Sequence, residues 1–143
     1  MTAIHIFKAI IATVVGAFVA AVGGFDAFLK SLLILMGIDY TLGLIVAGVL
    51  RKSAKSENGG LSSAAGWFGL VKKMTILLLI VVAVEIDCLL GSEFVRSSTI
   101  IFFSINEIIS ITEHAGTIGL PMPDAIKKAI DMLKSKNQQE QEK

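Results

Sequence analysis

The sequence is poor in charge, cysteine and proline, and these shortages exclude several classes of protein. Its 143 residues include 17% charged residues, one cysteine and two prolines. A single cysteine, Cys88, rules out an intrachain disulfide framework and leaves no cysteine-based metal site. The net charge of +1 provides no electrostatic footprint for nucleic acid, so nucleic-acid binding is not expected.

Catalytic patterns are also missing from the sequence. The two histidines, His5 and His114, lie far apart along the chain. No motif pairs a nucleophile with a base, and no glycine-rich loop follows a strand pattern. The sequence therefore predicts a protein that is not an enzyme and uses no cofactor or metal.

Apolar residues, by contrast, are abundant and continuous. They make up 54% of the chain, and the mean hydropathy is +0.76. A bilayer core of about 30 Å requires about 20 helical residues. Four stretches approach or exceed this length, and they predict an all-α membrane protein with three or four transmembrane helices, four being favoured. The predicted spans cover residues 9–24, 28–50, 74–91 and 95–115.

The first of these stretches has two interpretations. It is short, and its basic start at Lys8 is also typical of a signal peptide. However, Gly16 and Ala20 belong to a series of small residues that recurs every four positions, which is typical of a helix-packing face. This pattern favours retention as a span. If the stretch were cleaved or lay flat on the membrane, three spans would remain.

The segments outside the spans are more polar. Residues 51–73 are predicted to form a loop whose second half lies at the interface with Trp67 as an aromatic anchor, or else an ordinary connection. Residues 116–143 are predicted to be cytoplasmic, with an amphipathic helix after Pro123 and a disordered polar tail from Ser135.

The basic residues predict the topology. Five lie in the central loop, five follow Pro123, and Lys8 precedes the first span, whereas only Lys30 and Arg96 lie near the opposite ends. Positive charge concentrates on the cytoplasmic side of membrane proteins. Both termini and the central loop are therefore predicted to be cytoplasmic, which an even number of spans satisfies.

Polar residues inside the spans are the candidate functional residues, because each ionisable group costs about 2.5 to 3.5 kcal/mol at a helix centre. Asp39 and Glu107 are expected at similar depth and to face a shared polar interior, where at least one acid would be protonated or share a proton. The alternative is that these groups only hold a packed bundle together by hydrogen bonds. The candidates for the pore or for assembly are Asp39, Glu85, Asp87, Asn106, Glu107 and Ser110.

Small residues also predict where the second span packs. Asp39, Gly43 and Ala47 are spaced by four, so they lie on one helical face. Small residues allow close approach of two helices in a membrane. The predicted helix-packing residues are therefore Gly16, Ala20, Gly43 and Ala47.

Several short stretches, in this order and spacing, resemble a known family. They are residues 33–50 with Asp39-Tyr40-Thr41-Leu42-Gly43, the loop end Gly69-Leu70-Val71-Lys72-Lys73, residues 100–112 with Asn106-Glu107, and Gly119-Leu120-Pro121-Met122-Pro123. Together they resemble the toxin-secretion and phage-lysis holins, bacteriophage holin family 4, over roughly residues 30–135.

The resemblance implies a protein that oligomerises in the bacterial cytoplasmic membrane and forms pores or lesions. These would release an endolysin or a large toxin, with no enzymatic activity. The resemblance does not imply a direct contact with that cargo. Two other functions stay open on the sequence, a small proton-coupled transporter and a non-conducting membrane adaptor. A transporter of the small multidrug type would need an acid in the first span, which has none.

Overall fold

The computed structural model describes residues 2–50 and 63–141, which form five helices joined by short connections. The helices are α1 (Thr2–Ala21), α2 (Ala27–Gly48), α3 (Ser63–Leu90), α4 (Phe94–Ile118) and α5 (Asp124–Gln141). These ranges contain no strand. The predicted all-α fold class is therefore confirmed.

Three of the helices, α1, α2 and α4, are long and apolar enough to cross a membrane. Helix α3 is not among these three, and it carries two lysines and two acids along its 28 residues. It begins at Ser63, so the second half of the predicted loop 51–73 is the first part of a continuous helix. A membrane span at residues 74–91 of α3 stays a prediction.

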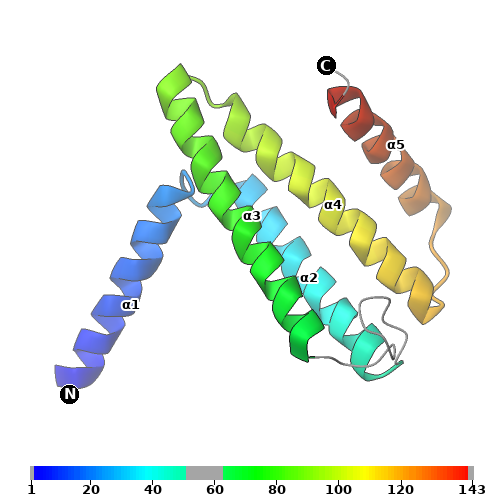
Figure 1. Cartoon of the computed structure of the whole chain (residues 1–143), viewed down its shortest axis with the longest axis horizontal. Coiled ribbons are helices and arrows are strands. Elements are labelled where there is room, and N and C mark those ends of the chain that lie inside the picture. The colour runs from blue at the N-terminus through cyan, green and yellow to red at the C-terminus, as the bar shows by residue number, and fades with distance from the viewer. Residues whose placement is uncertain (1, 51–62, 142–143) are drawn as a thin grey trace.

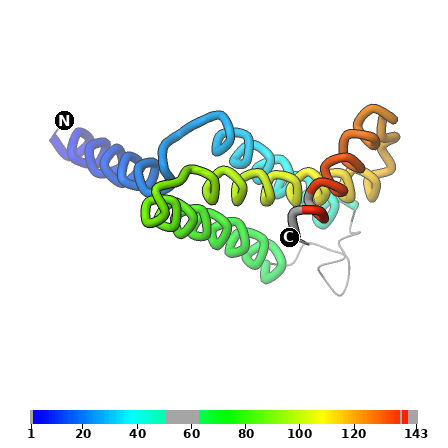
Figure 2. The backbone as a smooth tube through the Cα atoms, turned by 90° about the horizontal axis from the view of Figure 1, so that it is seen from above, coloured from blue at the N-terminus to red at the C-terminus, as the bar shows by residue number. Residues whose placement is uncertain are grey.

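Helices α2, α3 and α4 form a bundle, and α1 diverges from it (Figures 1 and 2). Helices α2 and α4 run in the same direction and α3 runs in the opposite one, so the α1–α2 and α3–α4 turns lie at the same end. Helix α4 contacts both α2 and α3, and α5 turns back beside it. The three-helix bundle is thus the packed body of the protein.

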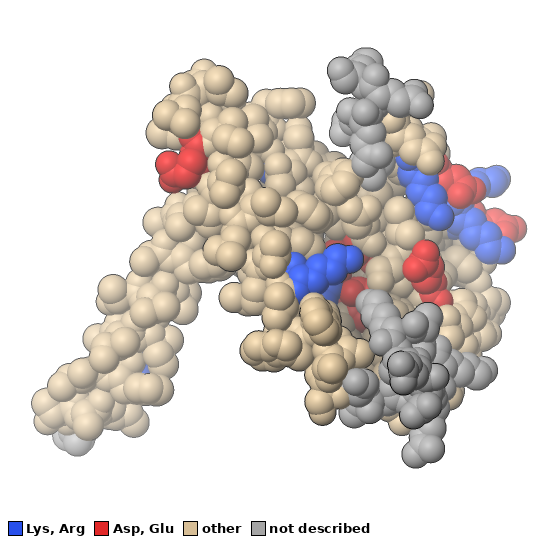
Figure 3. All heavy atoms as spheres, viewed as in Figure 1, with Lys and Arg blue, Asp and Glu red and all other residues tan. Residues whose placement is uncertain are grey.

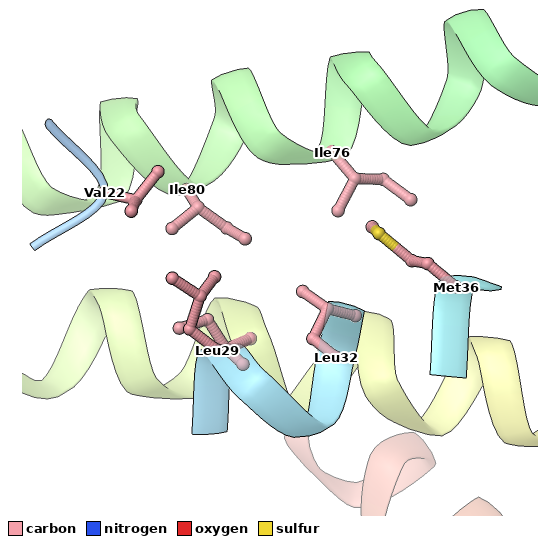
Figure 4. Packing of buried hydrophobic residues seen from close by; sticks show 7 residues of the cluster. Val22, Leu29, Leu32, Met36, Ile76 and Ile80 are labelled. Atoms are coloured by element: carbon pink, nitrogen blue, oxygen red, sulfur yellow. The ribbon is translucent and has the colours of Figure 1, made fainter. Parts of the chain in front are cut away.

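The bundle core contains apolar side chains from all three helices and from the turn before α2 (Figure 4). Val22, in that turn, is 0% exposed, although it directly follows the exposed helix α1. In lipid, such packing is driven by van der Waals contact rather than by exclusion of water. The core residues are Val22, Leu29, Leu32, Met36, Ile76, Ile80 and Ile100.

The ends of the chain differ in part from the sequence prediction. Helix α5 continues through Gln141, so the segment predicted to be disordered from Ser135 is helical up to that residue. Among the α5 residues whose burial is described, Ile130 alone is buried and most others are exposed, in agreement with an amphipathic helix. The basic residues Arg51, Lys52 and Lys55, which belong to the central loop used for the topology prediction, lie outside the described residues.

Candidate functional site

Three charged side chains meet inside the bundle, one from each of its helices. The Lys73 Nζ atom of α3 lies 2.9 Å from Asp39 Oδ2 of α2 and 2.5 Å from Glu107 Oε2 of α4. Their side chains are only 13%, 11% and 7% exposed, respectively. Lys73 therefore bridges two carboxylates that belong to neighbouring helices.

His114 of α4 completes this group on the side of α2. Its Nε2 atom lies 3.4 Å from Asp39 Oδ1, and a Cβ atom at Gly43 would lie 3.4 Å from the same nitrogen. Glycine at position 43 thus leaves room for the imidazole against α2. We call Asp39, Lys73, Glu107 and His114 the ion cluster.

The ion cluster lies near the middle of the two flanking helices. With a rise of about 1.5 Å per residue, Asp39 is about 18 Å along α2 from Ala27, and Glu107 is about 20 Å along α4 from Phe94. The structure thus places the two acids at the similar depth that the sequence predicts. Ser110 and Gly43 lie one turn beyond Glu107 and Asp39, on the interior side of the same two helices.

The cation between Asp39 and Glu107 changes the protonation that was expected for these two acids. The prediction that one acid is protonated or shares a proton assumed that the two carboxylates meet without a cation. Lys73 lies between them, so it relieves their mutual repulsion directly. The two carboxylates and one ammonium carry a formal charge of −1, which becomes 0 when His114 is protonated. Removing one partner of such a buried group typically destabilises a protein by about 3 to 5 kcal/mol.

The other predicted polar residues lie elsewhere. Glu85 of α3 and Asn106 of α4 are exposed, so neither belongs to the ion cluster. Asp87 is only 6% exposed, but it lies at the far end of α3, next to the α3–α4 turn. The sequence analysis treated these residues as one set. In the structure, Asp39 and Glu107 lie in the interior cluster, Asp87 lies at a helix end, and Glu85 and Asn106 lie on the surface.

Asp87 acts as the cap of the next helix. Its carboxylate accepts hydrogen bonds from the backbone amides of Val95 (2.9 Å) and Arg96 (2.7 Å) and from the Ser92 hydroxyl (2.5 Å). Glu93 occupies the N-cap position of α4 but its side chain makes no cap bond. The first amides of a helix lack partners within it, so Asp87 supplies the missing acceptor.

Arg96 joins α4 to the α1–α2 turn. Its guanidinium donates to the carbonyl oxygens of Val22 (2.6 Å) and Gly24 (3.0 Å) and to the carboxylate of Asp26 (2.6 Å). Asp26 is in turn the N-cap of α2, where it accepts from the Leu29 amide. The hydrogen bond from Arg96 holds the pKa of Asp26 below its usual value. We call these contacts the Arg96 clamp.

The predicted packing residues divide into two groups. On α2, Ala47 is 8% exposed and Gly43 adjoins His114, so this face does pack within the chain. On α1 every described residue but Val19 is exposed, and a Cβ atom at Gly16 would have no neighbour within 4 Å. The small-residue face of α1 with Gly16 and Ala20 is therefore not covered by any of the described residues.

Sequence reasoning did not select Lys73 or Arg96 as site residues, because their charges served mainly to predict the topology. One signal for Lys73 was present. Two acids placed near the centre of two spans need a cation, and Lys73 directly precedes the apolar part of the third predicted span. Within residues 2–50 and 63–141, no group of three or more His, Cys, Asp or Glu side chains is arranged to hold a metal ion.

Comparison with known proteins places this architecture in a family. The model of the bacteriophage holin family matches residues 16–135. A protein of Bacillus phage phi105 named "Probable holin" is 34% identical over 117 residues, covering 81% of each chain.

Uncharacterised bacterial proteins are similar as well. One from Halalkalibacterium halodurans is 36% identical over 78% of this chain and 82% of its own. One from Listeria innocua is 35% identical over 85% of this chain and 81% of its own. No solved structure matches the chain. The family model covers most of the sequence, and the resemblance seen in the sequence is confirmed: this membrane protein belongs to the bacteriophage holin family.

Proposed function

We propose that the protein oligomerises in the bacterial cytoplasmic membrane and opens lesions that release an endolysin or a large exported toxin. The observation that carries this proposal is the family match over residues 16–135, together with the relative named as a probable holin. The ion cluster gives a second, physical argument for the proposed function. A transmembrane bundle rarely keeps several ionisable groups at mid-depth unless they have a functional role.

The distribution of charge suggests how one chain rests in lipid before a lesion forms. In the view of Figure 3, α1 presents an almost uncharged surface and charged side chains gather over α5, while smaller charged groups lie at the upper left and near the centre of the bundle. Lys73, Asp39 and Glu107 face one another instead of the lipid. In a lesion, several copies would rearrange so that these polar groups line a hydrated path.

The proposed arrangement in the membrane has four spans, α1 to α4, with both termini on the cytoplasmic side. Exposed Lys72 and the basic residues of α5 support this orientation, since basic residues prefer that side. Lys73 does not contribute, because its charge is paired inside the bundle. Trp67 and Phe68 are exposed near the start of α3, as side chains anchored at a membrane interface would be.

We further propose that α1 forms the contact between copies. It is apolar and uncovered along its length, and its small residues would let a second helix approach closely. Gly16→Leu is expected to weaken cross-linked oligomers several-fold without unfolding the chain, because the position has open space around it.

Gly37→Leu is the matched control for this experiment, since Gly37 also has open space but lies on α2. Cross-linking ladders of both variants in membranes, at equal protein levels, make the comparison. Equal ladders for Gly16→Leu and Gly37→Leu would contradict an α1 interface.

The decisive test of function is timed expression in a bacterium with and without a co-expressed endolysin. The protein alone should collapse the membrane potential and stop growth, and the endolysin should convert this arrest into abrupt lysis. The endolysin alone, held in the cytoplasm, should leave the cells intact and serves as the control. Full potential and viability despite abundant inserted protein would refute the proposal and favour an adaptor.

A further inference from the structure

One buried oxygen of the ion cluster has no hydrogen-bond donor within residues 2–50 and 63–141. Asp39 Oδ2 accepts from Lys73, whereas Asp39 Oδ1 is buried and has no partner among these residues. The residue as a whole is only 8% exposed. A buried acceptor without a donor is unfavourable, so this oxygen marks a place where a donor would bind strongly.

The Ser110 hydroxyl of α4 also approaches Asp39, but the group opposite Oδ1 whose charge can change is the imidazole of His114. Its Nε2 atom is 3.4 Å away, and the ring is held there between α4 and the backbone of α2 at Gly43. A protonated imidazole donates through both ring nitrogens and carries a positive charge, whereas a neutral ring has one donor and no charge. Histidine is also the side chain whose charge changes near neutral pH.

The charges around His114 come from every helix packed against this part of α4. Asp39 belongs to α2, Lys73 to α3 and Glu107 to α4 itself, and their sum is −1 when both acids are ionised. The other candidates are Glu113 of α4 and the charged residues of α5 whose burial is described, and all of these are exposed: Asp124, Lys127, Lys128, Asp131, Lys134 and Lys136. The immediate surroundings therefore carry one uncompensated negative charge next to the ring.

We propose that His114 and Asp39 Oδ1 form a proton-binding site at the contact between α2 and α4. Proton uptake by His114 makes its Nε2–H a charged donor toward Asp39 Oδ1 and brings the ion cluster to zero net charge. Because protonation adds attraction between α2 and α4, the packed bundle is more stable at low pH and loses this stabilisation as the pH rises and the ring gives up its proton. This last step rests on the proposed function: acidification then delays lesion formation.

The test uses the full chain in detergent micelles and in liposomes, with His114→Gln as the variant and His5→Gln as the matched control. His5 is the only other histidine and is exposed on α1. Between pH 8 and pH 5 the unfolding midpoint of the wild type and of His5→Gln should rise by about 4 °C or more, as one charged hydrogen bond would produce. His114→Gln should lose this rise.

Nitrogen NMR of the imidazole rings gives an independent reading in the wild-type chain, with His5→Gln identifying the signals of His114. A His114 ring that stays neutral from pH 8 to pH 5, or equal pH dependence of His114→Gln and wild type, would overturn the proposal. If His114→Gln does not fold, the ring titration alone decides.

Dye release from liposomes separates this site from the proposed function. The release rate of the wild type should fall several-fold from pH 8 to pH 5, and that of His114→Gln should not. A ring that titrates in a protein that releases no dye at any pH would support the proton site and refute the lesion. Dye release at a rate that does not change with pH, together with a His114 ring that stays neutral, would support the lesion and refute the proton site.

Discussion

Lys73→Met is expected to be the most damaging single substitution in the bundle. It removes the only cation that contacts both Asp39 and Glu107 in the described structure, and it leaves two buried carboxylates facing each other. A loss of about 3 to 5 kcal/mol is expected from breaking such a buried group. Thermal unfolding in micelles and the onset of lysis at matched membrane levels measure the effect.

Two further variants serve as controls for this prediction. Lys72→Met removes the neighbouring, exposed lysine and should leave stability close to wild type. The triple variant Lys73→Met, Asp39→Leu, Glu107→Leu removes all three charges and should recover most of the lost stability, because apolar replacements of a whole buried ion group are often neutral. If Lys73→Met unfolds no earlier than Lys72→Met, the ion cluster does not hold the bundle together.

Gly23→Val is expected to have the second largest effect, by opening the Arg96 clamp. Gly23 has a φ of 80°, which is unfavourable for a β-branched side chain and costs about 1 to 3 kcal/mol. A Cβ atom there would also lie 2.7 Å from Arg96 Nε. The guanidinium must therefore move away from the carbonyl of Val22, and the turn loses its attachment to α4.

Gly24→Val separates these two causes. Gly24 has a φ of 98°, but a Cβ atom there meets nothing within 4 Å. It therefore carries backbone strain without displacing Arg96. We expect Gly23→Val to unfold clearly earlier than Gly24→Val, and to expose the turn to proteolysis in micelles. Equal unfolding midpoints would mean that only the backbone conformation matters at this turn.

The membrane-length helices α2 and α4 were predictable because the length of an uninterrupted apolar stretch indicates a span. Expected spans at 28–50 and 95–115 correspond to α2 and α4 within a few residues. The start of α3 was missed because Lys72 and Lys73 interrupt the apolar pattern, and a charge in sequence looks like the end of a span. In the structure Lys73 points into the bundle, where its charge is paired, so the helix continues through it to Ser63.

The composition of the site was only partly predictable. Depth along a helix follows from counting residues, so Asp39 and Glu107 were expected at one level. Which side of a helix faces its neighbour depends on tertiary packing, and adjacent residues such as Asn106 and Glu107 point in different directions. Asn106 is therefore exposed while Glu107 is buried. Asp87 was expected in the outer part of the third span as a pore or assembly candidate, but its partners are backbone amides that no sequence pattern displays.

The spacing of the ion cluster along the chain also bears on how the protein is made. Asp39 and Lys73 are 34 residues apart, and Lys73 and Glu107 are again 34 apart. At a translation rate of about 5 to 20 residues per second, each partner emerges from the ribosome about 2 to 7 seconds after the previous one. During the first interval the nascent α2 has its acid but no lysine, so the apolar residues of that helix must outweigh a lone carboxyl group at the translocon. The ion cluster is completed when α4 is synthesised. A nascent chain that stops before Glu107 has Lys73 with only one of its two acids.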